Sequence, residues 1–338
     1  MLIKGNTVII FIFLGRDFIL KITTEELHER QKWTLEQKID HSLGTLEQFY
    51  NYTNGKCVVM FSGGKDSTVL LHLARRMYPD IKAVFVNTTN EFSEILKFVR
   101  NTNNVDEVRP KMTFFQTVEK YGFPLISKKV AKAIQYIKYP SSKNDKVRNL
   151  VLTGYNSKGQ KCESYKLAKK WYFLKDEVFE ITHKCCEILK HKPFAEYQKQ
   201  NDVYPITGIM ADNSQQRKGN YLQYGCNILN GKKAVSRPLS IWNDEDIWNY
   251  IKMFNVSYCE VYDKGEKNTG CAYCGFGCHL EKESRFERLK EREPKRYEQM
   301  MKLSNNGVSY ETAIQTVLKK PKCEGRNKNY VQVSTNVD

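Results

Sequence analysis

The sequence predicts an α/β protein built on a doubly wound, mostly parallel sheet. An apolar run at residues 57–61 leads into a glycine turn and then into an amphipathic helical pattern. Further strand-like runs at 81–86 and 105–109 are each followed by a helical pattern. Strands that alternate with helices are typical of parallel sheets covered by helices. The chain has 338 residues, of which 41% are hydrophobic, and this is enough for a sizeable core.

Hydrophobic periodicity and capping residues predict the remaining elements. A cap-like Thr23 precedes a helix expected over 24–50, and a strand is expected at 204–209. Further helices are expected at 93–101, 113–121, 161–174, 243–254, 281–301 and 313–319. Residues 140–159, rich in Ser, Asn, Lys and Gly, are expected to form a loop or insertion.

Residues 62–67, Ser-Gly-Gly-Lys-Asp-Ser, form a candidate phosphate-binding loop between the first strand and its helix. Adjacent glycines let backbone N–H groups approach a phosphate, and the N-terminus of a helix favours an anion. Ser62 and Ser67 add hydroxyl donors. The spacing is not that of the Walker motif, which has four residues between its first glycine and the Gly-Lys pair. An ordinary tight turn is the alternative. Residues 87–92 follow the next strand and belong to the same carboxyl edge, where ligands bind in such sheets.

The net charge of +16 indicates a polyanionic partner. Between Lys128 and Lys192 stand 16 Lys or Arg residues against six Asp or Glu. The aromatic residues interleaved with them are Tyr136, Tyr139, Tyr155, Tyr165, Trp171 and Tyr172. Phosphates bind Lys and bases stack on rings, so this stretch predicts nucleic-acid binding. A solvated basic surface with core aromatics is the alternative.

Ten cysteines in a long, Lys-rich chain without a cleavable signal predict a reducing cytoplasm rather than a disulfide framework. The apolar run at 8–14 is too short to span a bilayer, so no membrane association is expected; it is interpreted as a strand or an unstructured leader.

The tandem Cys185-Cys186 and the distant pair Cys271 and Cys274 are candidate metal ligands. Thiolates from two separated segments suit an iron–sulfur cluster or a zinc ion, although adjacent cysteines bind a single ion awkwardly. Cys278 has three alternative roles: a spare ligand, a sulfur-carrying or redox thiol, or a packed side chain. Four other cysteines are expected to pack as small apolar residues: Cys57, Cys162, Cys226 and Cys259.

Four ordered motifs between about residues 56 and 274 resemble the phosphoadenosine phosphosulfate (PAPS) reductase family of the PP-loop ATP-pyrophosphatase superfamily. These motifs are residues 62–67, 86–92, 206–217 and 237–251. The resemblance implies an adenine nucleotide alpha-hydrolase-like fold that binds an adenine nucleotide by its phosphates. The cysteine pattern is similar to the ligands of the 4Fe-4S cluster in adenosine phosphosulfate (APS) reductases.

The resemblance also implies roles for individual residues. ATP, or alternatively APS or PAPS, would be bound by Ser62, Gly63, Gly64, Lys65, Asp66, Ser67, Asn87, Thr88, Gly208, Ser214 and Arg217. Asp66 would lie near a Mg²⁺ ion. Cys185, Cys186, Cys271 and Cys274 would bind the cluster, with Lys190 beside it. The expected domains are an N-terminal strand and helix extension (1–50), a nucleotide domain with a basic insertion near 128–192 (51–255), and a Cys-rich helical region with a disordered tail (256–338).

Two departures from the family leave the reaction open. The reductases carry a catalytic cysteine in a Glu-Cys-Gly-Leu-His setting, whereas Cys323 stands in Lys-Cys-Glu-Gly. The arginine expected after the Thr-Gly-Ile stretch is replaced by Met210 and Ala211.

The sequence is therefore consistent with three functions. The first is ATP-dependent activation of a nucleic acid and transfer of sulfur from a donor, with Asp66 at the metal and Cys278 as a candidate carrier. The second is sulfonucleotide reduction, in which Cys323 attacks APS or PAPS and a thioredoxin-like reductant releases sulfite. The third is a non-enzymatic, metal-stabilised nucleic-acid-binding module.

Overall fold

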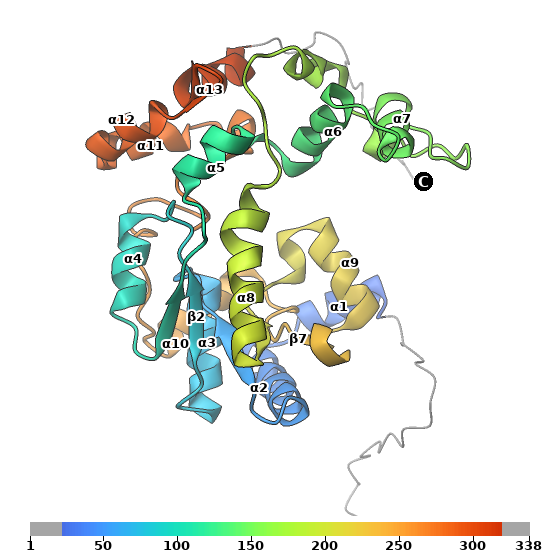
Figure 1. Ribbon diagram of the computed structural model, residues 1–338. Helices are drawn as coiled ribbons and strands as arrows, with labels where there is room; N and C mark the ends of the chain where they lie inside the picture. The colour runs from blue at the N-terminus through green and yellow to red at the C-terminus, as the bar shows by residue number, and fades with distance from the viewer. Residues whose placement is uncertain (1–21, 320–338) are drawn as a thin grey trace, which may run out of the picture. The chain divides into compact units, whose positions relative to one another are not determined.

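The computed structural model describes residues 22–319 (Figure 1). The chain divides into two compact units that are each discontinuous in sequence. The first unit contains the described chain up to Phe61, then Lys65–Ala83 and Val203–Tyr258. The second contains Ser62–Gly64, Val84–Asp202 and the described chain from Cys259 onward.

The first unit is built on four strands in the order β1-β5-β7-β6. Their bounds are β1 Cys57–Met60, β5 Tyr204–Thr207, β6 Asn227–Ile228 and β7 Val235–Ser236. β1 pairs in parallel with β5, with Cys57 opposite Tyr204, and β5 pairs in parallel with β7, whereas β6 is antiparallel to β7. The predicted α/β class, a mostly parallel sheet with flanking helices, is confirmed.

Helices supply the remaining core of the first unit. They are α1 Thr24–Gln31, α2 Leu35–Tyr52, α3 Lys65–Met77, α9 Gln215–Tyr224 and α10 Asp244–Met253, with short 3₁₀ turns at Ala211–Asn213 and Gly231–Lys233. The apolar faces of α2 and α3 are buried, as Phe49 and Leu70 show. The single helix expected over 24–50 is two helices, because Thr34 forms a capping box with Gln37 and starts a new helix.

The second unit contains the neighbouring strands β2 (Ala83–Val86) and β3 (Val105–Val108) and most of the helices. Its α-helices are α4 Ser93–Arg100, α5 Phe114–Tyr121, α6 Lys128–Lys138, α7 Asp145–Thr153, α8 Lys192–Asn201, α11 Arg285–Arg292, α12 Pro294–Met301 and α13 Tyr310–Lys319. Two small sheets join it: β4 (Leu125–Ile126) parallel to β8 (Gly275–Phe276), and β9 (Ser304–Asn305) antiparallel to β10 (Val308–Ser309). α11, α12 and α13 follow one another at the red end of the chain (Figure 1).

Three further expected elements also differ from the structure. The expected loop at 140–159 contains helix α7, and the expected helix at 161–174 is instead two 3₁₀ segments, Glu163–Tyr165 and Lys169–Lys175. The expected helix at 281–301 is divided into α11 and α12, because Pro294 lacks the N–H that a continuous helix would use. The expectations for 8–14 and for the C-terminal tail lie outside the described residues.

Within residues 22–319, none of the helices combines the length and the apolar character needed to cross a bilayer.

Candidate functional site

The two glycines of the candidate phosphate loop are required by close packing. Gly63 has φ +71°, and a Cβ there would lie 2.9 Å from Cγ2 of Val99. A Cβ on Gly64 would lie 2.3 Å from Oγ1 of Thr269 and 3.2 Å from the hydroxyl of Tyr262. No side chain fits at either position without movement of its neighbours. The loop backbone is therefore tightly held against the segment that contains Tyr262 and Thr269.

Lys65 is the first residue of α3 and lies at the positive end of that helix. Its buried ammonium donates to Asp66 Oδ1 at 2.8 Å and to Asp244 Oδ1. Burial alone would lower the pKa of Lys65, but the hydrogen bonds to the two carboxylates outweigh burial and raise it. Lys65 is thus a fixed cation next to the loop. The sequence does not single out Asp244 as a site residue; it lies in the first turn of the helix expected at 243–254.

The motif at residues 206–217 contains a closely packed glycine, Gly208, and the N-cap residue of α9, Ser214. A Cβ on Gly208 would lie 3.1 Å from the backbone oxygen of Asp66, so a larger residue would require the end of β5 or the start of α3 to move by a few tenths of an ångström. Ser214 caps α9 by accepting the N–H of Arg217, and the Arg217 guanidinium donates to Asn213 at 2.6 Å. Ser214 and Arg217 therefore have structural partners here, and their nucleotide contacts stay a prediction.

The loop after β2 is held by its own polar side chains. Asn87 Nδ2 donates to Glu107 at 2.8 Å, and Asn87 Oδ1 accepts the N–H of Thr89. Thr88 Oγ1 donates to Glu91 at 2.6 Å and lies 3.5 Å from the sulfur of Cys271. Thr88, predicted as a nucleotide contact, is thus placed against a cysteine.

The four predicted metal ligands line one small cavity. Cys185 and Cys186 directly precede a π-helical turn, Glu187–His191, and such turns are frequent at functional sites. Cys271 and Cys274 come from the loop before β8. The cavity is lined by Asn90, Phe114, Cys185, Cys186, Leu189, Lys190, Cys271, Cys274 and Phe276. Sequence positions 85 residues apart therefore line one cavity, and the binding of a metal there stays a prediction.

Burial and neighbouring thiolates raise the pKa values of the thiols in this cavity. Burial raises the pKa of Cys185, and Cys271, Cys274 and Cys186 each raise it further. Burial likewise raises the pKa of Cys274 to about 12. The negative charge of Cys271 is the main cause that raises the pKa of Lys190. Thiolates here require a compensating cation.

The donor set fits an iron–sulfur cluster. Four thiols meet between apolar side chains, Lys190 supplies a positive charge, and the amide nitrogen of buried Asn90 has no hydrogen-bond partner among residues 22–319. In the same part of the chain, no three Cys, His, Asp or Glu side chains are arranged around a position for one metal ion. Four thiolates can serve either as the ligands of a zinc ion or as the ligands of an iron–sulfur cluster.

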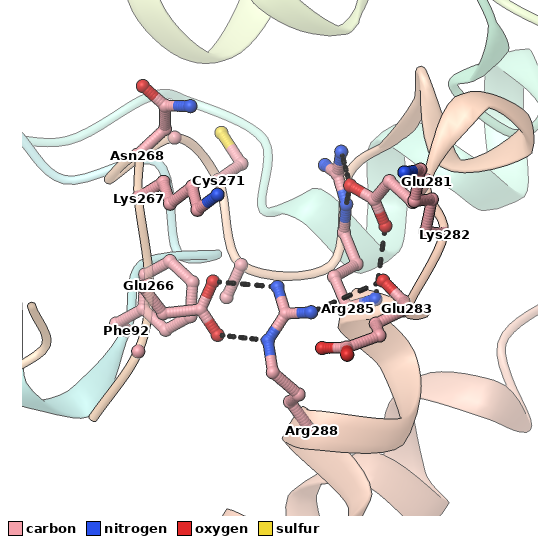
Figure 2. A pocket seen from close by; sticks show the side chains of 13 residues that line it. Phe92, Glu266, Lys267, Asn268, Cys271, Glu281, Lys282, Glu283, Arg285 and Arg288 are labelled. Carbon is pink, nitrogen blue, oxygen red and sulfur yellow. Dashed lines mark hydrogen bonds and ion pairs between the residues drawn. The ribbon is translucent and has the colours of Figure 1, made fainter.

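A cleft of about 560 Å³ opens beside Cys271 (Figure 2). Its lining residues are Phe92, Gly265, Glu266, Lys267, Asn268, Gly270, Cys271, Ala272, Glu281, Lys282, Glu283, Arg285 and Arg288. Of the four candidate ligands, Cys271 is the one that lines both this cleft and the cysteine cavity.

Most charges in the cleft are paired. Arg288 donates to Glu266, and Arg285 donates to Glu281 and to the carbonyl of Cys274, as the dashed lines in Figure 2 partly show. No hydrogen bond or ion pair within the described chain involves the side chain of exposed Lys267.

The other candidate cysteines are placed differently. Cys278 is buried, does not line the cysteine cavity, and has a pKa raised to about 11 by burial. Cys323 lies outside the described residues. All nine described cysteines are free thiols.

The basic segment 128–192 divides into buried and exposed aromatics. Trp171 is buried, whereas Tyr139, Tyr155 and Tyr165 are exposed. A second hollow, of about 340 Å³, is lined by Lys120, Tyr121, Gln135, Tyr136, Tyr139, Asn144, Glu180 and Lys184. Cations and rings therefore lie together here, and nucleic-acid binding stays a prediction.

Comparison with known proteins identifies a matching family model and similar sequences. A family model described as the phosphoadenosine phosphosulfate reductase domain matches residues 56–131 and 126–276. An uncharacterized protein of Methanocaldococcus jannaschii is 24% identical over 86% of this chain and 58% of its own length. An adenosine 5'-phosphosulfate reductase of Halalkalibacterium halodurans is 22% identical over 69% of this chain and 80% of its own length.

One similar solved structure is the U34-tRNA thiolase NcsA from Methanococcus maripaludis with its [4Fe-4S] cluster. It is 16% identical, with a TM-score of 0.38, over 85% of this chain and 90% of that one.

Proposed function

Because the chain belongs to the phosphoadenosine phosphosulfate reductase family, we propose that it binds ATP at Ser62–Ser67 and uses it to transfer sulfur to a nucleic acid. The family fold binds adenine nucleotides, and characterised members are enzymes. The first relatives are longer proteins, of which this chain spans 58% and 39%.

One observation carries this proposal: a single segment packs against the phosphate loop and supplies two of the four cysteines, Cys271 and Cys274. Thr269 and Tyr262 pack on Gly64, and Cys271 follows Thr269 by two residues. Two residues span at most about 7 Å of extended chain. A phosphate group held at the loop would therefore lie close to the cysteine cavity, as sulfur transfer to an activated group requires.

The chain's own groups suit the activation step. An oxygen of the acceptor attacks the α-phosphorus of ATP, a P–O bond breaks, and pyrophosphate leaves. Lys65 and the N-terminus of α3 stabilise the negative charge that develops on the leaving group. A hydrosulfide-level donor then displaces AMP, so the acceptor's C–O bond is replaced by C–S without net oxidation.

The cysteine cavity would hold the 4Fe-4S cluster through Cys185, Cys186, Cys271 and Cys274, with Lys190 beside them. When bound, the cluster would supply iron and sulfide that can bind and deliver sulfur. The cleft of Figure 2 gives the acceptor a route to it, because Cys271 lines both hollows and Lys267 supplies a cation for a phosphate.

Sulfonucleotide reduction is the second candidate, supported by the relatives named as APS reductases. In that reaction a thiolate attacks the sulfur of APS and AMP leaves. A dithiol then reduces the enzyme-bound thiosulfonate and releases sulfite.

One assay separates the two functions. Anaerobically purified protein is incubated with ATP, sulfide and mixed RNA or single-stranded DNA, or instead with APS or PAPS and a dithiol. The proposal expects pyrophosphate and a thiolated nucleoside in the first reaction and no sulfite in the second. Cys271→Ser should abolish thiolation, whereas Cys226→Ser should not. Absence of ATP consumption with every acceptor would refute the proposal, and sulfite release that Cys323→Ser abolishes would establish the alternative.

A further inference from the structure

The side chain of Asn90 is held in one orientation beside the candidate cluster ligands. Its Oδ1 accepts the backbone N–H of Tyr273 at 3.1 Å, and its backbone oxygen accepts the N–H of Ala272 at 2.7 Å. A backbone N–H can only donate, so the atom that faces Tyr273 must be the amide oxygen. Ala272 and Tyr273 are the two residues between Cys271 and Cys274. Asn90 therefore fixes the backbone between these two ligands.

The other end of this amide has no protein partner. Asn90 is fully buried, and its Nδ2 makes no hydrogen bond within residues 22–319. Buried donors in native proteins are almost always satisfied, so an unpaired one indicates a missing acceptor. Asn90 lines the cavity with the four cysteines, where the other lining residues are apolar except for Lys190. The acceptors that a cluster would place in this cavity are sulfur atoms.

We infer that Asn90 Nδ2 donates an N–H···S hydrogen bond to the iron–sulfur cluster and raises its reduction potential. Reduction adds negative charge to the cluster, and a donor aimed at a sulfur stabilises the more negative state. Lys190 contributes a full charge at the same cavity. Asn90 adds a neutral donor whose direction is fixed by the Cys-x-x-Cys backbone itself, so it is a positioning and tuning residue. This inference rests on the cluster of the proposed function but not on ATP chemistry.

The test compares Asn90→Leu with wild-type protein. Leucine keeps the approximate volume and removes the donor. We expect the equilibrium constant for one-electron reduction to fall roughly tenfold, which is about 59 mV in an anaerobic potentiometric titration monitored by EPR. Resonance Raman spectra of the oxidised cluster give an independent signature. Iron–sulfur stretching bands that shift in D₂O should be present in the wild type and reduced in the variant.

Two further variants keep the test decisive. Asn201→Leu removes an exposed amide that donates to the carbonyl of Tyr197 at 2.9 Å, and it should leave the potential and the Raman bands unchanged. If Asn90→Leu does not retain the cluster, Asn90→Asp preserves an oxygen for Tyr273 and lacks the N–H, so the deuterium-sensitive shift should again be reduced. Unchanged potential and unchanged bands in the Asn90 variants would overturn the inference. Absence of any cluster in wild-type protein would instead contradict the proposed function.

Discussion

Gly64→Ala tests whether the position of the phosphate loop depends on its packing against the segment that contains Tyr262, Thr269 and Cys271. The new Cβ would lie 2.3 Å from Thr269 Oγ1, whereas ordinary contact begins near 3.4 Å, so about 1.1 Å of movement is needed. Gly64 does not have a positive φ, so the backbone itself tolerates alanine. Threonine is β-branched and has few rotamers, so we expect the segment around Thr269 to shift. A displacement of about 1 Å in a reacting geometry costs roughly 10²-fold, or about 2.7 kcal/mol of activation free energy.

The assay is the rate of acceptor-dependent pyrophosphate release, with calorimetric titration of a non-hydrolysable ATP analogue. Thr269→Ala removes the clashing oxygen, so the double variant Gly64→Ala/Thr269→Ala should recover most of the lost rate. Gly219→Ala is the matched control, because no atom lies within 4 Å of its new Cβ. Wild-type rates in Gly64→Ala, or no recovery in the double variant, would show that the packing of Gly64 against Thr269 does not control the reaction rate.

Three further predictions concern other parts of the chain. Lys38→Met leaves Asp246, its 2.6 Å partner, buried without a cation, so urea unfolding should show a loss of about 3–5 kcal/mol. Lys65→Gln should weaken ATP binding by about 1.5–3 kcal/mol in calorimetry, because a charged hydrogen-bond donor is lost. Lys120→Ala should lower the salt dependence of single-stranded RNA binding by about one phosphate contact, whereas Tyr136→Ala should weaken binding without changing that slope. Equal salt slopes in Lys120→Ala and wild-type protein would contradict a phosphate contact there.

Local sequence rules predicted much of the fold but not the interruptions of its helices. The strand, glycine turn and helix at 57–77 are predicted by residues that are close in sequence, and the structure has them there. The break before α2 depends on whether Thr34 caps a new helix or points away, which its hydrophobic pattern does not reveal. Pro294, by contrast, is a visible signal for the start of α12 that the charged helical pattern obscured.

The residues of the candidate site were likewise only partly predictable from the sequence. The resemblance to a family predicted that Cys185, Cys186, Cys271 and Cys274 meet, and they line one cavity. Asn90 could not be assigned to that cavity from sequence, because its role depends on which end of the amide faces Tyr273. The signal available was its place in the polar run after β2. Tertiary packing, rather than residue type, therefore decides which polar group in this run faces the cysteines.

The most direct test of the account is the iron and acid-labile sulfide content of the protein purified without oxygen. The proposal predicts about four irons and four sulfides per chain, the composition of a cluster held by four cysteines. Cys271→Ser should lower both values, and Cys226→Ser should leave them unchanged. One zinc per chain, or no metal in wild-type protein that is otherwise folded, would contradict the account.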